Sequence, residues 1–399
     1  MAMRSIPVSD RVTWVGAIDW NLRDFHGYET PRGTSYNAYL VRGDDKTALV
    51  DTVKLPFVDE LLSRISDTMD PASIDLIVVN HVEPDHNSGL RKVMEAMPNA
   101  RVVASRGGVA GVAEYHDGLA VESVGAEDEI DLGGISLKFL PMPMVHWPDS
   151  MFTYVAGDKT LLPNDAFGQH MASAERFADE VGLDLALREL DIYYANILMP
   201  LGTQVSKAVA KVLDSGWEID TIAPSHGVIW RGDTLAKAIE LYARRTSGET
   251  LDKVVVAFST MWGSTDTLAR AIADGVASTG VAVEIYDLAV SPVATITHEL
   301  LEARGFLLGS PTLHHGMLYR VAGYLQYLSG LKPAGKIAGS FGSFGWSSGA
   351  TKQMNERLEA IGFELPFESY TQKYRPTVQD IDDARAWGIQ FAEEIRNRR

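Results

Sequence analysis

The sequence predicts an α/β protein of two domains. After residue 250, strand-like and helix-like segments alternate strictly, which is typical of a doubly wound parallel sheet. Before residue 250, short strand-like segments predominate with helical patterns between some of them, which indicates sheets enclosed by helices. A polar, glycine-containing stretch at 244–252 separates the two parts. We therefore expect one domain at 1–250 and another at 251–399.

Short apolar segments rich in β-branched residues predict the strands of the first domain. They are expected at 35–41, 46–50, 76–79, 101–104, 135–140, 151–155 and 160–162. Amphipathic patterns predict helices between or after some of these strands. They are expected at 57–69, 87–97 and 234–245.

The second domain is predicted from a strict strand–helix rhythm. Its strands are expected at 253–258, 281–286, 305–309 and 335–341, and its helices at 265–279, 317–329, 349–361 and 377–396. Because parallel strands end at one edge of their sheet, the loops that follow them should lie side by side and form a ligand site.

Composition excludes several classes of function. The net charge of −17 argues against nucleic acids and anionic membranes as partners. No apolar run is long enough to span a bilayer, and the first ten residues have no signal-like apolar core. The expected location is therefore the cytoplasm. The 399 residues contain no cysteine, which excludes disulfides, thiolate metal sites and a rubredoxin module within them.

A six-residue run after the strand at 76–79 carries four potential metal ligands. They are His81, Glu83, Asp85 and His86. Pro84 biases the residue before it toward an extended conformation, so the first three ligands should point to one side and the fourth elsewhere. One run would then serve two adjacent metals. Imidazole and carboxylate ligands together suit transition metals.

Three further loops carry ligand-type residues. His146, Asp165 and His226 each lie in a loop punctuated by proline or glycine, where the backbone can be held rigidly. A single histidine of this kind is more often structural, but seven ligand-type residues in such positions are hard to explain as solvated surface. The sequence Trp-Pro-Asp149-Ser indicates a turn rather than a ligand.

The second domain carries a hydroxyl-rich loop between its first strand and first helix. Hydroxyls, a glycine and a helix N-terminus suit a phosphate group, although an ordinary helix N-cap explains the loop about as well. Neither the Walker A nor the Rossmann glycine pattern is present. With two later loops at the same sheet edge, this loop resembles the FMN site of flavodoxins. The implicated residues are Ser259, Thr260, Met261, Trp262, Gly263, Ser264, Thr265, Pro311, Thr312, Leu313, His314, Ser343, Phe344, Gly345, Trp346 and Gly349.

The metal motif resembles that of the metallo-β-lactamase fold, whose zinc hydrolases carry His-x-His-x-Asp-His. Here Glu83 replaces the middle histidine, and an anionic oxygen ligand favours iron. Together with the flavodoxin-like loops, this substitution makes the chain similar to the flavodiiron proteins, or A-type flavoproteins. That family includes rubredoxin:oxygen oxidoreductases and nitric oxide reductases. The resemblance implies a metallo-β-lactamase-like αββα sandwich followed by a flavodoxin-like doubly wound parallel sheet.

The resemblance also implies FMN and a non-haem diiron site as cofactors. One iron would be held by His81, Glu83, His146 and bridging Asp165, and the other by Asp85, His86, Asp165 and His226. The family varies at the position of His86, and some members do not use it as a ligand. The resemblance further implies that His26, Tyr28 and Tyr194 reach the diiron pocket. His170 and Asp51 are candidates for supporting the ligands.

The implied function is an oxidoreductase that reduces O₂ to water, NO to N₂O, or both, with FMN supplying electrons. The implied electron donor is a separate rubredoxin, a reductase or reduced deazaflavin. The implied assembly is a head-to-tail homodimer or a dimer of dimers. One alternative is a zinc hydrolase of the metallo-β-lactamase fold with an attached flavodoxin-like domain, against which Glu83 argues. Another is a flavodoxin-like electron carrier with a structural metal domain. The residue types that would bind the metals do not rank O₂ against NO.

Overall fold

The computed structural model describes residues 3–333 and 335–398. These residues form two compact units. The first unit holds the chain up to His26 together with Thr30–Tyr193 and Leu201–Ser247, and the second holds Gly27–Glu29, Tyr194–Pro200 and the chain from Gly248 onward. Among the described residues, no helix combines the length and apolar character needed to cross a membrane.

Two mixed sheets form the inner layers of the first unit. The first sheet has the order β1 (Ile6–Pro7), β2 (Val12–Trp14), β7 (Tyr39–Arg42), β8 (Thr47–Val50), β9 (Leu76–Val79), β10 (Arg101–Ser105) and β11 (Glu122–Val124). The second has the order β12 (Glu129–Asp131), β13 (Ser136–Pro141), β14 (Met151–Ala156), β15 (Thr160–Leu162), β16 (Thr221–Ile222) and β17 (Trp230–Arg231). Their facing side chains form one core.

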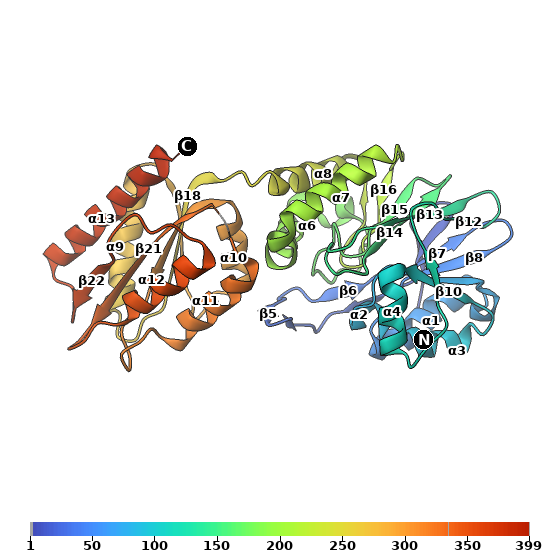
Figure 1. Ribbon diagram of the computed structural model, residues 1–399, viewed down its shortest axis with the longest axis horizontal. Coiled ribbons are helices and arrows are strands. Elements are labelled where there is room, and N and C mark those ends of the chain that lie inside the picture. The colour runs from blue at the N-terminus through green and yellow to red at the C-terminus, as the bar shows by residue number, and fades with distance from the viewer. Residues whose placement is uncertain (1–2, 334, 399) are drawn as a thin grey trace. The chain divides into compact units, whose positions relative to one another are not determined.

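Strand β9 illustrates how the layers pack. Leu76 and Val78 belong to the buried cluster between the sheets, which includes Phe139 of β13. Ile77 and Val79 point the other way and pack with helices on the outer face. Helices therefore cover both outer faces, as Figure 1 shows for α1, α3 and α4 and for α6, α7 and α8.

The helices of the first unit are α1 (Val58–Ser66), α2 (Pro84–Asn87), α3 (Leu90–Ala96), α4 (Arg106–Tyr115), α5 (Ala178–Val181), α6 (Leu183–Tyr193), α7 (Gly202–Asp214) and α8 (Gly232–Thr246). The remaining short elements before residue 250 are strands β3 (Ala17–Asp19), β4 (Asp24–Phe25), β5 (Tyr28–Glu29) and β6 (Thr34–Tyr36), a π-helix (Tyr194–Leu198) and 3₁₀ turns (Leu55–Phe57, Pro71–Ser73 and Met199–Leu201).

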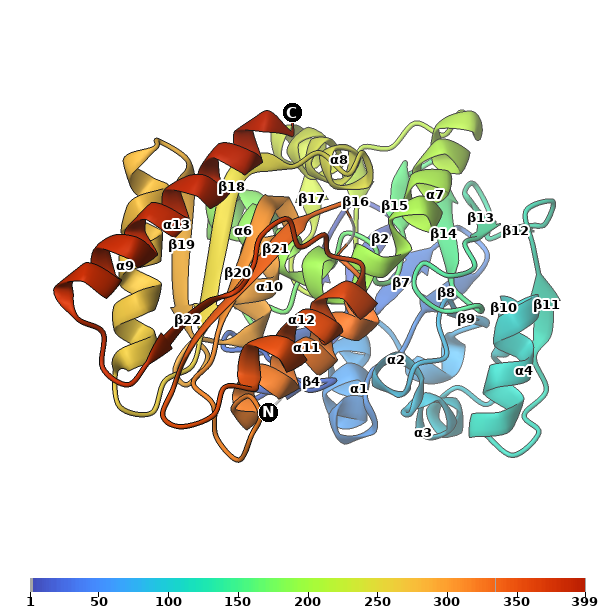
Figure 2. The same ribbon diagram turned by 60° about the vertical axis from the view of Figure 1, so that its left-hand side comes forward.

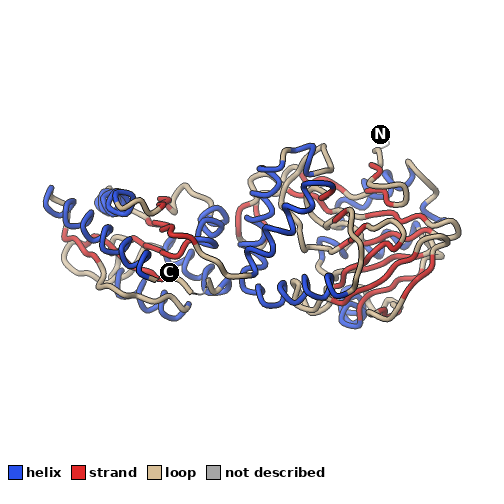
Figure 3. Tube along the Cα trace, turned by 90° about the horizontal axis from the view of Figure 1, so that it is seen from above, coloured by secondary structure: helices blue, strands red, loops and turns tan. Residues whose placement is uncertain are grey.

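A five-stranded parallel sheet forms the centre of the second unit. Its order is β19 (Ala282–Asp287), β18 (Leu251–Phe258), β20 (Ala303–Gly309), β21 (Ile337–Phe344) and β22 (Tyr370–Lys373). Helices α9 (Ser264–Ser278) and α13 (Val378–Asn397) cover one face, and α10 (Val293–Glu302), α11 (Tyr319–Leu331) and α12 (Ala350–Ile361) cover the other (Figure 2). Figure 3 shows these strands in red between the helices in blue.

The predicted fold class is confirmed, with local differences. The segment predicted as one strand over 35–41 forms two strands, β6 and β7. The helix predicted over 87–97 begins at Leu90, and a separate helical turn, α2, precedes it. Helix α10 was not predicted, because its β-branched residues lower helix propensity and tertiary packing overrides that preference. Strand β22 was not predicted, because it is four residues long and largely polar.

Candidate metal centre and flavin site

The seven predicted metal ligands lie in four loops that follow strands of the first unit. His81 comes after β9, His146 after β13, Asp165 after β15 and His226 after β16. All seven side chains are buried or nearly so. His81, Glu83, His146 and Asp165 offer ligand atoms within 4.8 Å of one another, and Asp85, His86 and His226 form a second such group. The structure thus brings together four segments that are distant in sequence.

The carboxylate of Asp165 lies between the two groups. Its Oδ2 is 2.9 Å from His146 Nε2 and 3.6 Å from His81 Nε2. Its Oδ1 is 3.1 Å from His86 Nε2 and 3.4 Å from His226 Nε2. Each carboxylate oxygen therefore faces a different pair of imidazoles, which is the arrangement that a bridge between two metals requires.

Hydrogen bonds at the far side of two imidazoles fix their orientation. His81 Nδ1 donates to Asp149 Oδ2 at 2.8 Å, and His226 Nδ1 donates to the Ser35 carbonyl at 2.7 Å. When Nδ1 carries the proton, the Nε2 lone pair is left for a metal. Asp149 also accepts from the Val82 amide at 2.8 Å. The residue that the sequence indicated as a turn therefore positions a ligand.

The site also has buried groups that call for a cation. Both carboxylate oxygens of Asp85 and both ring nitrogens of His86 are buried and make no well-formed hydrogen bond with the described residues, although other ligand side chains lie within 3.1–3.5 Å of His86 Nε2 and of both Asp85 oxygens. Buried polar groups without well-formed hydrogen bonds are costly, and charged ones more so. The carboxylates also favour positive charge in the site. Burial lowers the pKa of His81, but hydrogen bonds to Asp149 and Glu83 and the negative charge of Asp165 outweigh burial and raise this pKa to about 10. Three carboxylates and four imidazoles around one buried space fit two divalent or trivalent metal ions.

One expected geometry is wrong. The sequence led us to place His81, Glu83 and Asp85 on one side of an extended run, but Pro84 begins the helical turn α2. Proline suits the first position of a helix, because its φ is fixed and its missing N–H is not needed there. The turn moves Asp85 to the group of His86 and His226, where its Oδ2 lies 3.2 Å from His226 Nε2.

The other residues that were predicted to lie near the metals are found in different parts of the structure. His26 reaches the metal group, since its Nε2 lies 2.8 Å from Glu83 Oε1. Tyr28 and Tyr194 are buried in segments that belong to the second unit, and their role in the pocket stays a prediction. His170 lies beside His226, with ring centroids 5.1 Å apart, and its Nδ1 is 2.9 Å from the Thr34 hydroxyl.

Asp51 links two of the ligand loops. It accepts hydrogen bonds from the Asn80 amide at 2.8 Å and from the Asn164 side chain at 3.2 Å. Asn80 precedes His81 and Asn164 precedes Asp165, so one buried carboxylate ties together the starts of both loops. This geometry agrees with the supporting role expected of Asp51.

Asp149→Asn is expected to weaken iron binding by about 10- to 100-fold, because a neutral amide no longer polarises and orients His81. The measurement is competition for ferrous iron against a chelator of known affinity. Asp131→Asn is the matched control, since Asp131 is an exposed residue at the end of β12 whose side chain likewise accepts from a backbone amide, that of Gly133, but contacts no metal ligand. Equal iron affinity in the two variants would contradict a positioning role for Asp149.

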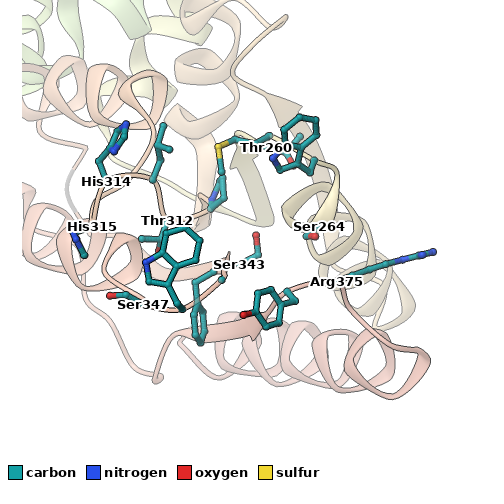
Figure 4. A pocket seen from close by; sticks show the side chains of 16 residues that line it. Thr260, Ser264, Thr312, His314, His315, Ser343, Ser347 and Arg375 are labelled. Atoms are coloured by element: carbon teal, nitrogen blue, oxygen red, sulfur yellow. The ribbon is translucent and has the colours of Figure 1, made fainter.

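A cavity of about 780 Å³ lies at the carboxyl edge of the sheet in the second unit. This volume is within the range of small-molecule and cofactor sites. Figure 4 shows Ser343 near its centre, with Thr260 and Ser264 on one side and His314 and His315 on the other. Predicted residues that line the cavity are Thr260, Met261, Trp262, Ser264, Pro311, Thr312, Leu313, His314, Ser343, Phe344, Gly345 and Trp346.

Four predicted residues support the cavity without lining it. Ser259 and Thr265 are buried, and the Thr265 hydroxyl lies 3.0 Å from that of Ser343. Gly263 has φ of +85° at the N-cap of α9, and its amide donates to the Thr260 hydroxyl at 3.1 Å. Gly349 packs against the loop that contains His315. The cavity walls therefore depend on side chains and backbone behind them.

Four residues that line the cavity were not predicted from the sequence, namely His315, Ser347, Tyr374 and Arg375. The last two follow β22, the strand that was not predicted. If a strand had been recognised at 370–373, its position at the same sheet edge would have indicated a fourth loop around the cavity.

The hydroxyl-rich loop fits a phosphate group. The loop at 259–265 contains four hydroxyl residues and no lysine or arginine. It leads into α9, whose first amides have no partner in the helix and carry a partial positive charge. A phosphate bound there would be held by hydroxyls, backbone amides and the helix dipole, without a cationic side chain from this loop. Exposed aromatic rings stand at the rim, with Trp262 93% and Trp346 89% exposed.

Gly349→Ala is expected to weaken FMN binding roughly tenfold, because overpacking costs about 1–3 kcal/mol. A Cβ on Gly349 would lie 2.3 Å from the His315 carbonyl oxygen and would push one cavity wall inward. The FMN dissociation constant can be measured from the fluorescence of released flavin. Gly323→Ala in α11 is the control, since nothing lies within 4 Å of its added Cβ. Unchanged FMN affinity in Gly349→Ala would show that this loop does not shape the site.

The αββα unit with two groups of histidine and carboxylate ligands and the parallel-sheet unit with a flavin-sized cavity define a metal-containing flavoprotein. Comparisons with known proteins support this class. Residues 34–227 match the family described as ODP family beta lactamase, and residues 256–388 match flavodoxin. The chain is 43% identical to a nitric oxide reductase of Moorella thermoacetica over 98% of both chains.

Two solved structures are also similar. The rubredoxin oxygen:oxidoreductase of Desulfovibrio gigas is 37% identical, with a TM-score of 0.95 over 99% of both chains. The flavodiiron protein of Giardia intestinalis is 33% identical, with a TM-score of 0.94 over 100% of this chain and 98% of that one. The chain belongs to the flavodiiron protein family. The predicted family, fold class and oxidoreductase class are confirmed, and FMN and a diiron centre are confirmed as the cofactors of the family. The hydrolase alternative is not favoured.

Proposed function

We propose that the protein reduces O₂ to water, NO to N₂O, or both, at a diiron centre in domain 1–250 that is supplied with electrons by FMN in domain 251–399. The observation that carries this proposal is the placement of Asp165, whose two oxygens face separate pairs of imidazoles. The reduction of O₂ takes four electrons and four protons, and that of two NO molecules takes two electrons and two protons. Two irons and reduced FMN, when bound, would supply these electrons.

The side chains of the first unit would hold the metals and balance their positive charge. His81, Glu83 and His146 would hold one iron, Asp85, His86 and His226 the other, and Asp165 both. Carboxylate ligands favour higher oxidation states, because they add negative charge beside the metals. His26 would carry a proton between solvent and the site, which is supported by its half-exposed side chain and by the 2.8 Å distance from its Nε2 to Glu83 Oε1.

The side chains of the second unit would bind and orient FMN. The loop at 259–265 would hold the phosphate, and the loops containing Thr312 and Ser343 would border the flavin ring. Trp346 and Tyr374 are placed to cover the ring, because both line the cavity and both are largely exposed.

Partners and assembly follow from the same proposal. The 399 residues contain no cysteine that could hold an iron–sulfur redox centre, and a rubredoxin, a reductase or reduced deazaflavin would donate the electrons. A head-to-tail homodimer, or a dimer of dimers, would bring the flavin of one chain to the irons of another. The cytoplasm is the proposed location. Sedimentation at assay dilution tests the assembly, and full activity in a monomer would contradict it.

The function is tested by metal analysis and anaerobic gas assays on the reduced protein. We expect two irons and one FMN per chain, and consumption of O₂, NO or both at rates that follow flavin reoxidation. Comparing the two rates ranks the gases. Zinc with hydrolytic activity would overturn the proposal, and iron without gas consumption would indicate an electron carrier.

A further inference from the structure

A second cavity, apolar throughout, lies in the first unit. It has a volume of about 220 Å³ and is bounded by α7, by α8 and by strands β14, β15 and β16. Apart from Trp217 and Tyr242, every residue that lines it is an alanine, valine, leucine, isoleucine or phenylalanine. Such a lining offers almost nothing to which a water molecule can form hydrogen bonds.

The two exceptions present rings rather than free polar groups. The Tyr242 hydroxyl accepts a hydrogen bond from the Phe167 amide at 2.6 Å, and the two rings stack with centroids 4.0 Å apart. Trp217 stacks on Tyr154, with centroids 4.6 Å apart and planes 8° from parallel. These contacts hold the wall in place and leave the cavity apolar.

The cavity is lined both by exposed residues and by buried residues next to two of the metal ligands. Leu213 and Ile239 are 74% and 40% exposed, which places them at the mouth. Val145 and Ala166 are each 2% exposed, which places them in the interior. Val145 immediately precedes the ligand His146, and Ala166 immediately follows the ligand Asp165. The inner wall is thus formed by the same two loops that carry these ligands.

We propose that this cavity binds an apolar diatomic gas and supplies it to the metal centre. The proposal rests on the proposed function, because O₂ or NO must reach a site whose ligands are buried. Both gases are small and apolar, and they partition from water into apolar spaces. An apolar cavity of about 150 Å³ takes up xenon or benzene, so one of this size and lining is large enough for a diatomic molecule. Because Val145 and Ala166 line the cavity, gas held there lies beside the two loops that carry His146 and Asp165.

Ala208 provides the test, because it is buried in α7 and lines the cavity. Ala208→Phe fills the space with a ring. Ala210→Phe is the matched control, since Ala210 is exposed on the same helix and does not line the cavity. Xenon is the probe, detected in pressurised crystals of the holoprotein or by ¹²⁹Xe NMR. Ala208→Leu provides a smaller filling residue if the larger one prevents folding.

We expect xenon to bind in the cavity of the wild type and of Ala210→Phe but not of Ala208→Phe. We also expect kcat/KM for the gas to fall at least about fivefold in Ala208→Phe, with kcat at saturating gas unchanged. Absence of xenon from the wild-type cavity would overturn the proposal, and so would equal kcat/KM in the two phenylalanine variants. A wild type that consumes neither gas would contradict the proposed function and the supply role together, whereas xenon uptake would still establish the binding site.

Discussion

Asp165→Asn is expected to release iron from both metal positions and to lower gas consumption at least about 100-fold. Its two carboxylate oxygens face the imidazoles of both ligand groups, at distances from 2.9 to 3.6 Å. An amide of the same shape has one oxygen and no charge, so it cannot bridge two cations. Metal analysis should give well below two irons per chain, and stopped-flow reoxidation should measure the lost activity.

Asp214→Asn is the control for this change, because Asp214 is an exposed residue at the end of α7. The flavin content of Asp165→Asn should equal that of the wild type, since the substitution lies in the other unit. Two tightly bound irons in Asp165→Asn would show that this carboxylate is not a bridging ligand.

Ser264→Glu is expected to raise the FMN dissociation constant by about three orders of magnitude. Ser264 lines the cavity and is the first residue of α9, where a phosphate dianion would lie near the helix N-terminus. Two like charges about 4 Å apart repel by about 4 kcal/mol at an effective dielectric of 20, and the loop has no lysine or arginine to offset this. The dissociation constant can be measured by titrating the flavin-free protein with FMN.

Ser264→Gln separates the effect of charge from that of size. Glutamine has nearly the same shape as glutamate but no charge, so its FMN dissociation constant should rise far less. If the two variants bind FMN equally, the phosphate does not lie at this helix N-terminus. The ionic strength should also matter, because added salt screens the repulsion in Ser264→Glu but changes little in Ser264→Gln.

Much of the fold could be predicted because its strands are recognisable from short runs of apolar residues. Val254, Val255 and Val256 of β18 pack alternately against the two helix layers, so the run reads as a strand buried on both faces. The signal is weaker where tertiary contacts decide the structure. Tyr370–Lys373 forms an edge strand by pairing with β21, and four partly exposed residues do not reveal that pairing beforehand.

The ligand residues could be predicted as a set, but their division into two groups could not be derived from spacing. The division depends on the helical turn that Pro84 begins, which follows directly on the extended conformation of its predecessor Glu83 and is not apparent from residue spacing. Asp149 was missed because its bond to His81 joins residues 68 positions apart. A turn motif predicts where the chain bends, but it does not predict which distant side chain the turn residue will contact.

The four ligand loops also have a consequence for how the metals are acquired. The first ligand is His81 and the last is His226, so the nascent chain lacks a complete site until most of the first unit has been synthesised. Metal loading should therefore follow folding of this unit rather than direct it. Once bound, the metals join loops from both sheets, so their release should require the whole unit to open rather than one loop to fray. Iron-starved cells should accordingly accumulate a folded apoprotein that can be activated without new synthesis, which pulse labelling followed by iron addition can measure.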